Sequence, residues 1–189
     1  KIIPGKPFRY LAISPTICKV SEKFSIRVKG EDLWGNPSNQ CSETFFLKSD
    51  LKINNLPDVI TFNEGDFTYI IKDLFSSKSG DCCVKFFDIN GELRFQTNPS
   101  RIEENPNIKY FWADLHGQSE ETIGTGSAEQ YFKFARDFAF LDATAHQGND
   151  FQMSNEFWAK LDKLCEKFDV DDEFVAIPGY EWSGNTSLG

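Results

Sequence analysis

The stretch Lys109-Tyr-Phe-Trp-Ala-Asp-Leu-His-Gly-Gln-Ser-Glu-Glu121 marks a change in the pattern of the sequence. Before it, short apolar runs predominate, some alternating with polar residues as in Lys23–Lys29, and none has helical spacing. After it, apolar runs typical of buried strands alternate with segments of helical spacing. The stretch also carries His116, one of two histidines in the chain. We therefore expect two domains, with a boundary close to this stretch.

Residues 1–105 have the pattern of a β-rich domain. Six or seven short apolar runs, separated by turn-forming residues such as Gly35 and Pro37, follow one another at roughly even spacing. Short strands at such spacing are typical of an antiparallel β-sandwich. The segment contains no histidine and no cluster of nucleophile and base. We therefore interpret it as a structural or spacer module, with a ligand-binding module as the alternative.

Residues 106–189 have the pattern of alternating strands and helices. The polar segment 100–107 fits a linker between the two domains. The expected elements are a strand over 108–115, a helix after Ser127 with Tyr131, Phe134, Ala135 and Phe138 on its apolar face, a strand over 140–145, a helix from Ser154 or Asn155 to 168, and a strand over 174–177. Nearly continuous apolar strands suit a parallel sheet covered by helices. The fold class that we predict is therefore α+β in two domains.

Three side chains with metal-binding chemistry recur at the same place in these units. His116, His146 and Glu181 each stand at the end of an expected strand, 30 and 35 residues apart. The carboxyl ends of parallel strands converge on one rim of a sheet. Two imidazoles and a carboxylate on one rim are suitable ligands for zinc, manganese or iron. The alternative is that each histidine is a hydrogen-bonded core or surface residue.

Further candidate site residues lie close to this rim in the sequence. They are Asp114, Gln118, Glu120, Glu121 and Asp150. Asp114 stands two residues before His116, so in a regular strand both side chains share a face. The acids of the loops are equally well interpreted as solvated side chains. No residue is assigned as a catalytic acid, base or nucleophile.

The charge and the cysteines limit the partners and the compartment. A net charge of −9, from 29 acidic and 20 basic residues, argues against nucleic acid or an anionic membrane surface as a partner. No apolar run approaches the ~20 residues that span a bilayer, so we expect a soluble protein without a membrane span. The sequence begins at Lys1 without an export signal, which leaves the compartment open, export included. Five cysteines without a Cys-x-x-Cys pair favour buried free thiols over a Cys18–Cys41 or Cys41–Cys83 disulfide.

Part of the second domain resembles a known superfamily. The motifs that carry the resemblance are Asp114-Leu-His-Gly-Gln-Ser119, Thr144-Ala-His146 and Gly179-Tyr-Glu181. They resemble the opening of a PHP domain, named for polymerase and histidinol phosphatase. Longer stretches around them are similar to a bacterial family of unknown function, in which an immunoglobulin-like region precedes a PHP-like barrel.

This resemblance implies a distorted (β/α)7 barrel that binds two or three metal ions and hydrolyses a phosphoester substrate. By motif position, His116 matches the first ligand of a His-x-His pair, His146 the histidine that ends the second motif, and Glu181 the bridging glutamate of the third. Two positions depart from the family pattern. Gln118 stands where the second histidine belongs, and Ala145 replaces the usual aspartate. An amide is a weaker ligand, so one metal position would be lost or altered.

Three β/α units cannot close a barrel of seven. We therefore expect an N-terminal fragment, with an immunoglobulin-like β-sandwich in residues 1–105 and an incomplete PHP-like barrel in residues 106–189. The full-length protein would be a metal-dependent phosphoester hydrolase. The fragment would be inactive, lack a complete metal site and self-associate through exposed sheet edges and apolar helix faces. The alternative is a non-catalytic binding or interaction protein with a degenerate PHP-like domain.

Overall fold

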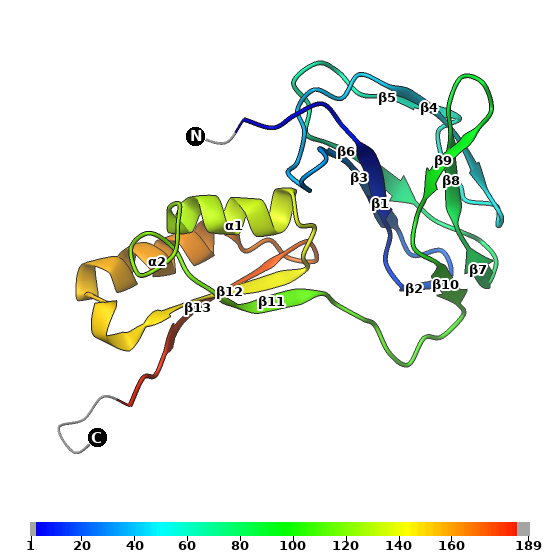
Figure 1. Cartoon of the computed structure of the whole chain (residues 1–189). Helices are drawn as coiled ribbons and strands as arrows, with labels where there is room; N and C mark the ends of the chain where they lie inside the picture. Colours follow the sequence, from blue (N-terminus) through cyan, green and yellow to red (C-terminus); the bar gives the residue numbers. More distant parts are fainter. Residues whose placement is uncertain (1–2, 185–189) are drawn as a thin grey trace. The chain divides into compact units, whose positions relative to one another are not determined.

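The computed structural model describes residues 3–184, and the chain divides into two compact units, Lys1–Tyr110 and Phe111–Gly189 (Figure 1). The division follows Tyr110, a few residues after the boundary that the sequence predicts at residue 105. Each unit has a hydrophobic core of its own. The two units therefore have separate interiors.

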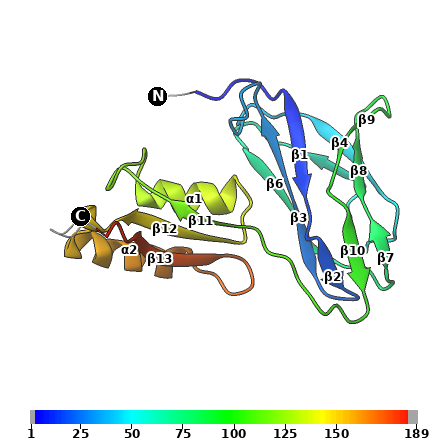
Figure 2. The same cartoon turned by 60° about the horizontal axis from the view of Figure 1, so that its bottom comes forward.

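Within residues 3–110, the first unit consists of ten β-strands. They are β1 (Arg9–Ile13), β2 (Ile17–Lys19), β3 (Phe24–Glu31), β4 (Thr44–Ser49), β5 (Val59–Thr61), β6 (Thr68–Leu74), β7 (Gly80–Cys82), β8 (Val84–Phe87), β9 (Leu93–Gln96) and β10 (Ser100–Glu103). They form three sheets with the strand orders β1-β3-β6, β2-β10-β7 and β5-β4-β8-β9 (Figure 2). All neighbours in these sheets are antiparallel except β2 and β10. No hairpin joins β2 to β10, so nothing imposes the predicted antiparallel direction on that pair.

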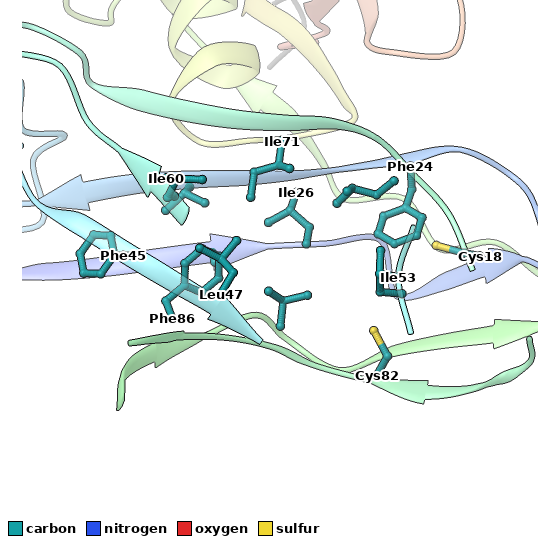
Figure 3. Close-up of a cluster of buried hydrophobic side chains, with 14 of the residues drawn as sticks. Cys18, Phe24, Ile26, Phe45, Leu47, Ile53, Ile60, Ile71, Cys82 and Phe86 are labelled. Atoms are coloured by element: carbon teal, nitrogen blue, oxygen red, sulfur yellow. The ribbon is translucent and has the colours of Figure 1, made fainter. Parts of the chain in front are cut away.

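The core of the first unit lies between its sheets. In β3, Ile26 and Val28 are fully buried and alternate with partly exposed residues, the pattern of a strand with one face in the core. Figure 3 shows Ile26 gathered with Phe45 and Phe86, which belong to β4 and β8 of another sheet. This arrangement is a β-sandwich, in agreement with the sequence prediction. The five cysteines of the chain are free thiols, four of them buried.

The second unit alternates strands and helices in the predicted order. Its elements are β11 (Ala113–Gly117), α1 (Ala128–Asp137), β12 (Ala143–Asn149), the 3-10 turn η1 (Asp150–Gln152), α2 (Asn155–Phe168) and β13 (Val175–Glu181). The three strands form a sheet of order β11-β12-β13, and both pairs are parallel. All three strands begin and end later than predicted: β11 begins at Ala113 rather than at residue 108, and β12 runs to Asn149 because the segment 147–149, expected as a loop, pairs with the segment 179–181. His146 therefore lies inside β12 rather than after it.

The helices of the second unit begin where the sequence indicates. Ser127 caps α1 in a reciprocal capping box with Gln130, and the Ser154 side chain accepts a hydrogen bond at the start of α2. The predicted apolar face of α1 is partly wrong. Phe132 is fully buried and Phe134 is half exposed. The face of α1 that packs in the core is the one that carries Ala128, Phe132 and Ala135.

Both helices cover one face of the sheet. The rings of Phe132 in α1 and Phe168 in α2 stack with centroids 5.7 Å apart. In β13, Ala176 is buried in this core, whereas Val175 and Ile177 on either side of it are exposed. The other face is therefore open, and residues 3–184 contain no closed barrel. None of the helices in this part of the chain is long and apolar enough to cross a membrane.

Candidate functional site

The structure brings together two of the three predicted ligands, His116 and Glu181. His116 lies near the carboxyl end of β11, and Glu181 is the last residue of β13. Nε2 of His116 is 3.6 Å from Oε2 of Glu181, although β12 lies between the two strands. The His116 side chain is 68% exposed and that of Glu181 41% exposed. The pair is therefore open to solvent and to small molecules.

The third predicted ligand, His146, does not join this pair. Its side chain is completely buried and packs edge-on against the rings of Tyr131 in α1 and Phe157 in α2. Its Nε2 is 2.8 Å from Oγ of Ser119. Burial lowers the pKa of His146, against the opposing effect of the nearby Glu121 carboxylate. The imidazole is therefore held in its neutral form.

A shift in strand register explains this separation. Asp114 is opposite Thr144, but Gly117 rather than His116 is opposite His146, because the pairing of β11 with β12 is irregular between Asp114 and Gly117. Side chains of a strand alternate between its two faces. His146 shares the face of Thr144, whose hydroxyl bonds to Tyr131 of α1, while the irregularity takes His116 out of this series.

The remaining candidate residues have ordinary structural partners or none. The Asp114 carboxylate accepts a hydrogen bond from the His116 backbone amide at 3.1 Å. The Gln118 side chain accepts one from the Thr122 hydroxyl at 3.0 Å. Asp150 accepts one from the Phe151 amide at 2.8 Å, and Glu120 is exposed. Apart from the bond of Asp114 to the His116 backbone, none of these hydrogen bonds involves His116 or Glu181.

Glu121 has a more defined environment than the other loop acids. Its two oxygens accept from Nζ of Lys160 at 2.6 Å and from the backbone amide of Ala128 at 3.0 Å. Burial by itself would raise the pKa of Glu121, but hydrogen bonds from Lys160, Ser119 and Ala128 lower it to about 2. Glu121 is therefore a carboxylate under all ordinary conditions.

Four buried polar side-chain atoms in the described part of the second unit lack a hydrogen-bond partner. Within the described residues, the buried side-chain atoms without a hydrogen-bond partner are Nδ1 of His146, Oδ1 of Asn149, Oε1 of Gln152 and Oγ of Ser183. His146 lies within β12, Asn149 ends it, Gln152 follows it in η1, and Ser183 follows β13. An unpaired buried polar atom costs about 1–3 kcal/mol, so such atoms normally serve a ligand or a bound water. Sequence reasoning missed the last three, because Asn, Gln and Ser are common in loops and carry no signal.

The donors that are present do not form a complete metal centre. Among residues 3–184, no group of three or more His, Cys, Asp or Glu side chains is arranged to hold a metal ion. The His116–Glu181 pair supplies two donors. Any further ligand has to come from another kind of side chain or from outside the described part of the chain.

Comparisons with known proteins give one curated relative. No family model matches the chain. An uncharacterised protein from Chlamydia pneumoniae is 22% identical over 181 residues, which cover 93% of this chain and 29% of that protein. The match therefore runs through both units, and this chain spans less than a third of the relative's length. The PHP resemblance stays an expectation drawn from the sequence motifs.

Solved structures are similar only at a low level. The D0-D1 domain of intimin matches with a TM-score of 0.37 and 10% identity over 49% of this chain and 46% of that one. A glycosyl hydrolase family 2 member from Bacteroides cellulosilyticus matches with a TM-score of 0.41 and 12% identity, over 52% of this chain and 14% of that one. Scores of this size establish neither a common fold nor a common function.

Proposed function

We propose that this chain is part of a longer metal-dependent hydrolase that acts on a phosphoester. The observation that carries the proposal is the 3.6 Å separation of His116 Nε2 and Glu181 Oε2. Two ligand atoms that each lie ~2.0–2.1 Å from a tetrahedral zinc ion are about 3.3 Å apart. A small movement of either exposed side chain would let both bind one divalent cation.

Oxygen acceptors that end or follow β12 and β13 support a cation. The unpaired atoms of Asn149, Gln152 and Ser183 are oxygens that can accept from, or coordinate, a positive centre. Zinc, manganese and iron all accept mixed nitrogen and oxygen ligands. A divalent cation bound here would supply Lewis acidity toward a phosphoester oxygen. The residues of this chain would hold the cation and leave its solvent side open for substrate.

The length of the relative supports a metal site whose ligands come partly from this chain and partly from the rest of a longer protein. The matched segment is 29% of the Chlamydia pneumoniae protein, so a protein of that size has further chain that can supply ligands. Under this proposal, His116 and Glu181 form one part of the centre. The rest of the centre belongs to the longer protein.

The test measures metal content and turnover in the longer protein. His116→Ala and Glu181→Gln should each lose bound transition metal and lose metal-dependent turnover of a panel of phosphoesters by at least ~100-fold. Glu120→Gln is the matched control, because Glu120 is an exposed carboxylate in the adjacent loop. Wild-type protein without bound transition metal, or variants that keep metal and turnover, would contradict the proposal.

A second candidate function is ligand binding by the first unit, and a groove there favours it. The groove has a volume of about 600 Å³. It is lined by Pro7, Phe8, Arg9, Tyr10, Glu43, Thr44, Phe45, Asp88, Ile89, Asn90, Arg94 and Phe95. The rings of Tyr10 and Phe45 pack on Phe95, with centroids 5.6 Å and 5.0 Å from it. Its size and its mixture of aromatic and charged side chains are typical of small-molecule sites.

This candidate predicts binding without turnover. A fragment library of small sugars and phosphoesters, screened by NMR, should shift resonances of Tyr10 and Phe95 and leave those of residues 111–184 unchanged. The same phosphoesters should show no metal-dependent hydrolysis. Shifts confined to the second unit, or turnover that depends on metal, would count against a binding function as the main role.

A further inference from the structure

A short turn of the first unit presents two large apolar side chains to solvent. It is the turn Asp32-Leu-Trp-Gly-Asn36, which directly follows β3. Leu33 is 62% exposed and Trp34 is 84% exposed. Adjoining exposed apolar residues of this size are typical of an interaction surface.

Hydrogen bonds fix the shape of this turn. The Asp32 amide donates to the Asn36 carbonyl at 2.9 Å. Oδ1 of Asp32 accepts from the amides of Trp34 and Asn36, both at 2.9 Å, and Oδ2 accepts from the Gly5 amide at 3.1 Å. Gly35 has a φ of +83°, which glycine adopts without strain. The backbone of Trp34 is therefore held in one conformation before a partner binds, and this lowers the entropy cost of binding.

The groove of the first unit begins beside this turn. Phe8 lines the groove and is 70% exposed, and its amide donates to the carbonyl of the last residue of β3 at 2.7 Å. Arg9 also lines the groove, and its Nη2 would lie 3.9 Å from a Cβ placed on Gly35. Ile89, in the turn between β8 and β9, lines the groove too and is 84% exposed. One continuous surface therefore carries both the protruding Trp34 and a recess.

The charges that line the groove balance one another. Two of its lining residues are basic and two are acidic, namely Arg9, Arg94, Glu43 and Asp88. Arg94 pairs with Asp88 at 3.2 Å, Tyr10 donates to Glu43, and Arg9 pairs with a buried carboxylate of β3 at 2.6 Å. Because these groups already have partners, the groove suits a neutral, apolar occupant better than an ion. Two chains that each carry a net charge of −9 can also meet here without a local excess of like charge.

We propose that two copies of this chain associate through this surface, with Trp34 of each copy inserted into the groove of the other. A twofold axis brings the same surface of two copies together, so every contact is made twice. A surface that bears a protruding side chain beside a recess is complementary to itself under that symmetry. Phe8 lies between the turn and the groove, so the two Phe8 side chains would meet close to the axis.

Size and residue type agree with this occupant. The groove has a volume of about 600 Å³, within the range of sites that enclose molecules larger than an indole ring. Tryptophan is among the residues that most often dominate the binding energy of an interface. A second copy would compete with a small molecule for the same groove. The inference does not rest on the proposed metal site, which belongs to the second unit.

Analytical ultracentrifugation of the chain over a range of concentrations tests the proposal. The average mass of the wild-type protein should rise from that of one chain toward that of two. Trp34→Ala should weaken the association at least about 30-fold, the loss expected for a side chain that dominates an interface. Trp182→Ala is the matched control and should change nothing, because Trp182 is a 73% exposed tryptophan of the second unit.

Two results would overturn the proposal. One is the mass of a single chain at every concentration up to about 1 mM, where only very weak association would escape detection. The other is an association that Trp34→Ala leaves unchanged, as contact through the sheet edges of the second unit would be. Fragments that bind at Tyr10 of a chain that stays single would likewise exclude the dimer and support a small-molecule site.

Ile89→Asp tests the groove side of the contact. It places a charge at the rim of the groove and should also weaken the association. An equal mixture of Trp34→Ala and Ile89→Asp chains should associate more tightly than either variant alone, because one chain keeps Trp34 and the other keeps an intact groove. A mixture no tighter than the separate variants would overturn the mutual insertion of Trp34.

Discussion

The two histidines of the chain have opposite environments, one exposed to solvent and the other buried in the core. His116 is 68% exposed beside Glu181, where its imidazole is accessible to solvent. His146 is fully buried between two aromatic rings and the Ser119 hydroxyl. A buried imidazole with a fixed hydrogen-bond partner keeps one orientation. His116 is thus the accessible imidazole, and His146 is the one with a fixed orientation.

The sequence predicts the neighbourhood of these side chains but not the faces on which they lie. Apolar runs mark the three strands, and polar residues at their ends mark the rim. The irregular pairing between Asp114 and Gly117 depends on contacts between distant strands. A shift of one residue moves a side chain to the other face of a sheet. The spacing of the strands in the sequence could therefore not show that His146 lies apart from His116 and Glu181.

The ionisation of Glu121 predicts a pH dependence of stability. Its pKa in the folded chain is about 2, below the ordinary value of 4.5, so folding favours the carboxylate. Its contribution is complete above the ordinary pKa and is lost as the pH falls toward the folded pKa. For a partly exposed group we expect about 1–2 kcal/mol.

Glu121→Gln should therefore lower the free energy of unfolding at neutral pH by this amount. The difference from wild type should shrink as the pH falls to about 3. Urea unfolding at several pH values measures it, with the exposed Glu120→Gln as control. A difference that stays constant with pH would contradict the assignment.

At the element scale, helix starts are well specified by local sequence and strand lengths are not. Ser127 and Ser154 both cap the helices that follow them, because capping needs only residues a turn away. β12 extends to Asn149 through pairing with β13, which no local pattern reveals. The buried face of α1 differs from the predicted one for the same reason, since two sets of residues have helical spacing and tertiary packing buries the one with Phe132.

The capping box of α1 predicts a measurable loss of stability. Ser127→Ala removes the acceptor for the Gln130 amide and should lower the free energy of unfolding by about 1 kcal/mol. Ser127→Asp keeps an acceptor and should stay within a few tenths of wild type. Urea midpoints of the three proteins give the comparison. Equal midpoints for Ala and Asp would show that the cap contributes nothing.

At the scale of the whole molecule, the chain is a β-sandwich followed by an α/β unit, each with its own core. The regular spacing of short strands predicted the first, and the alternation of strand and helix predicted the second. The parallel pairing of β2 with β10 was not predictable, because the two strands are far apart in sequence. A relative that extends well beyond this chain matches both units. Metal binding and phosphoester hydrolysis, which we propose for the longer protein, therefore have to be measured on that protein.

The most direct test of the metal proposal is a crystal structure of the longer protein grown with zinc, with anomalous scattering used to locate the metal. We predict an anomalous peak bonded to Nε2 of His116 and to a carboxylate oxygen of Glu181. A zinc-loaded protein whose peaks all lie away from these two side chains would contradict the proposal.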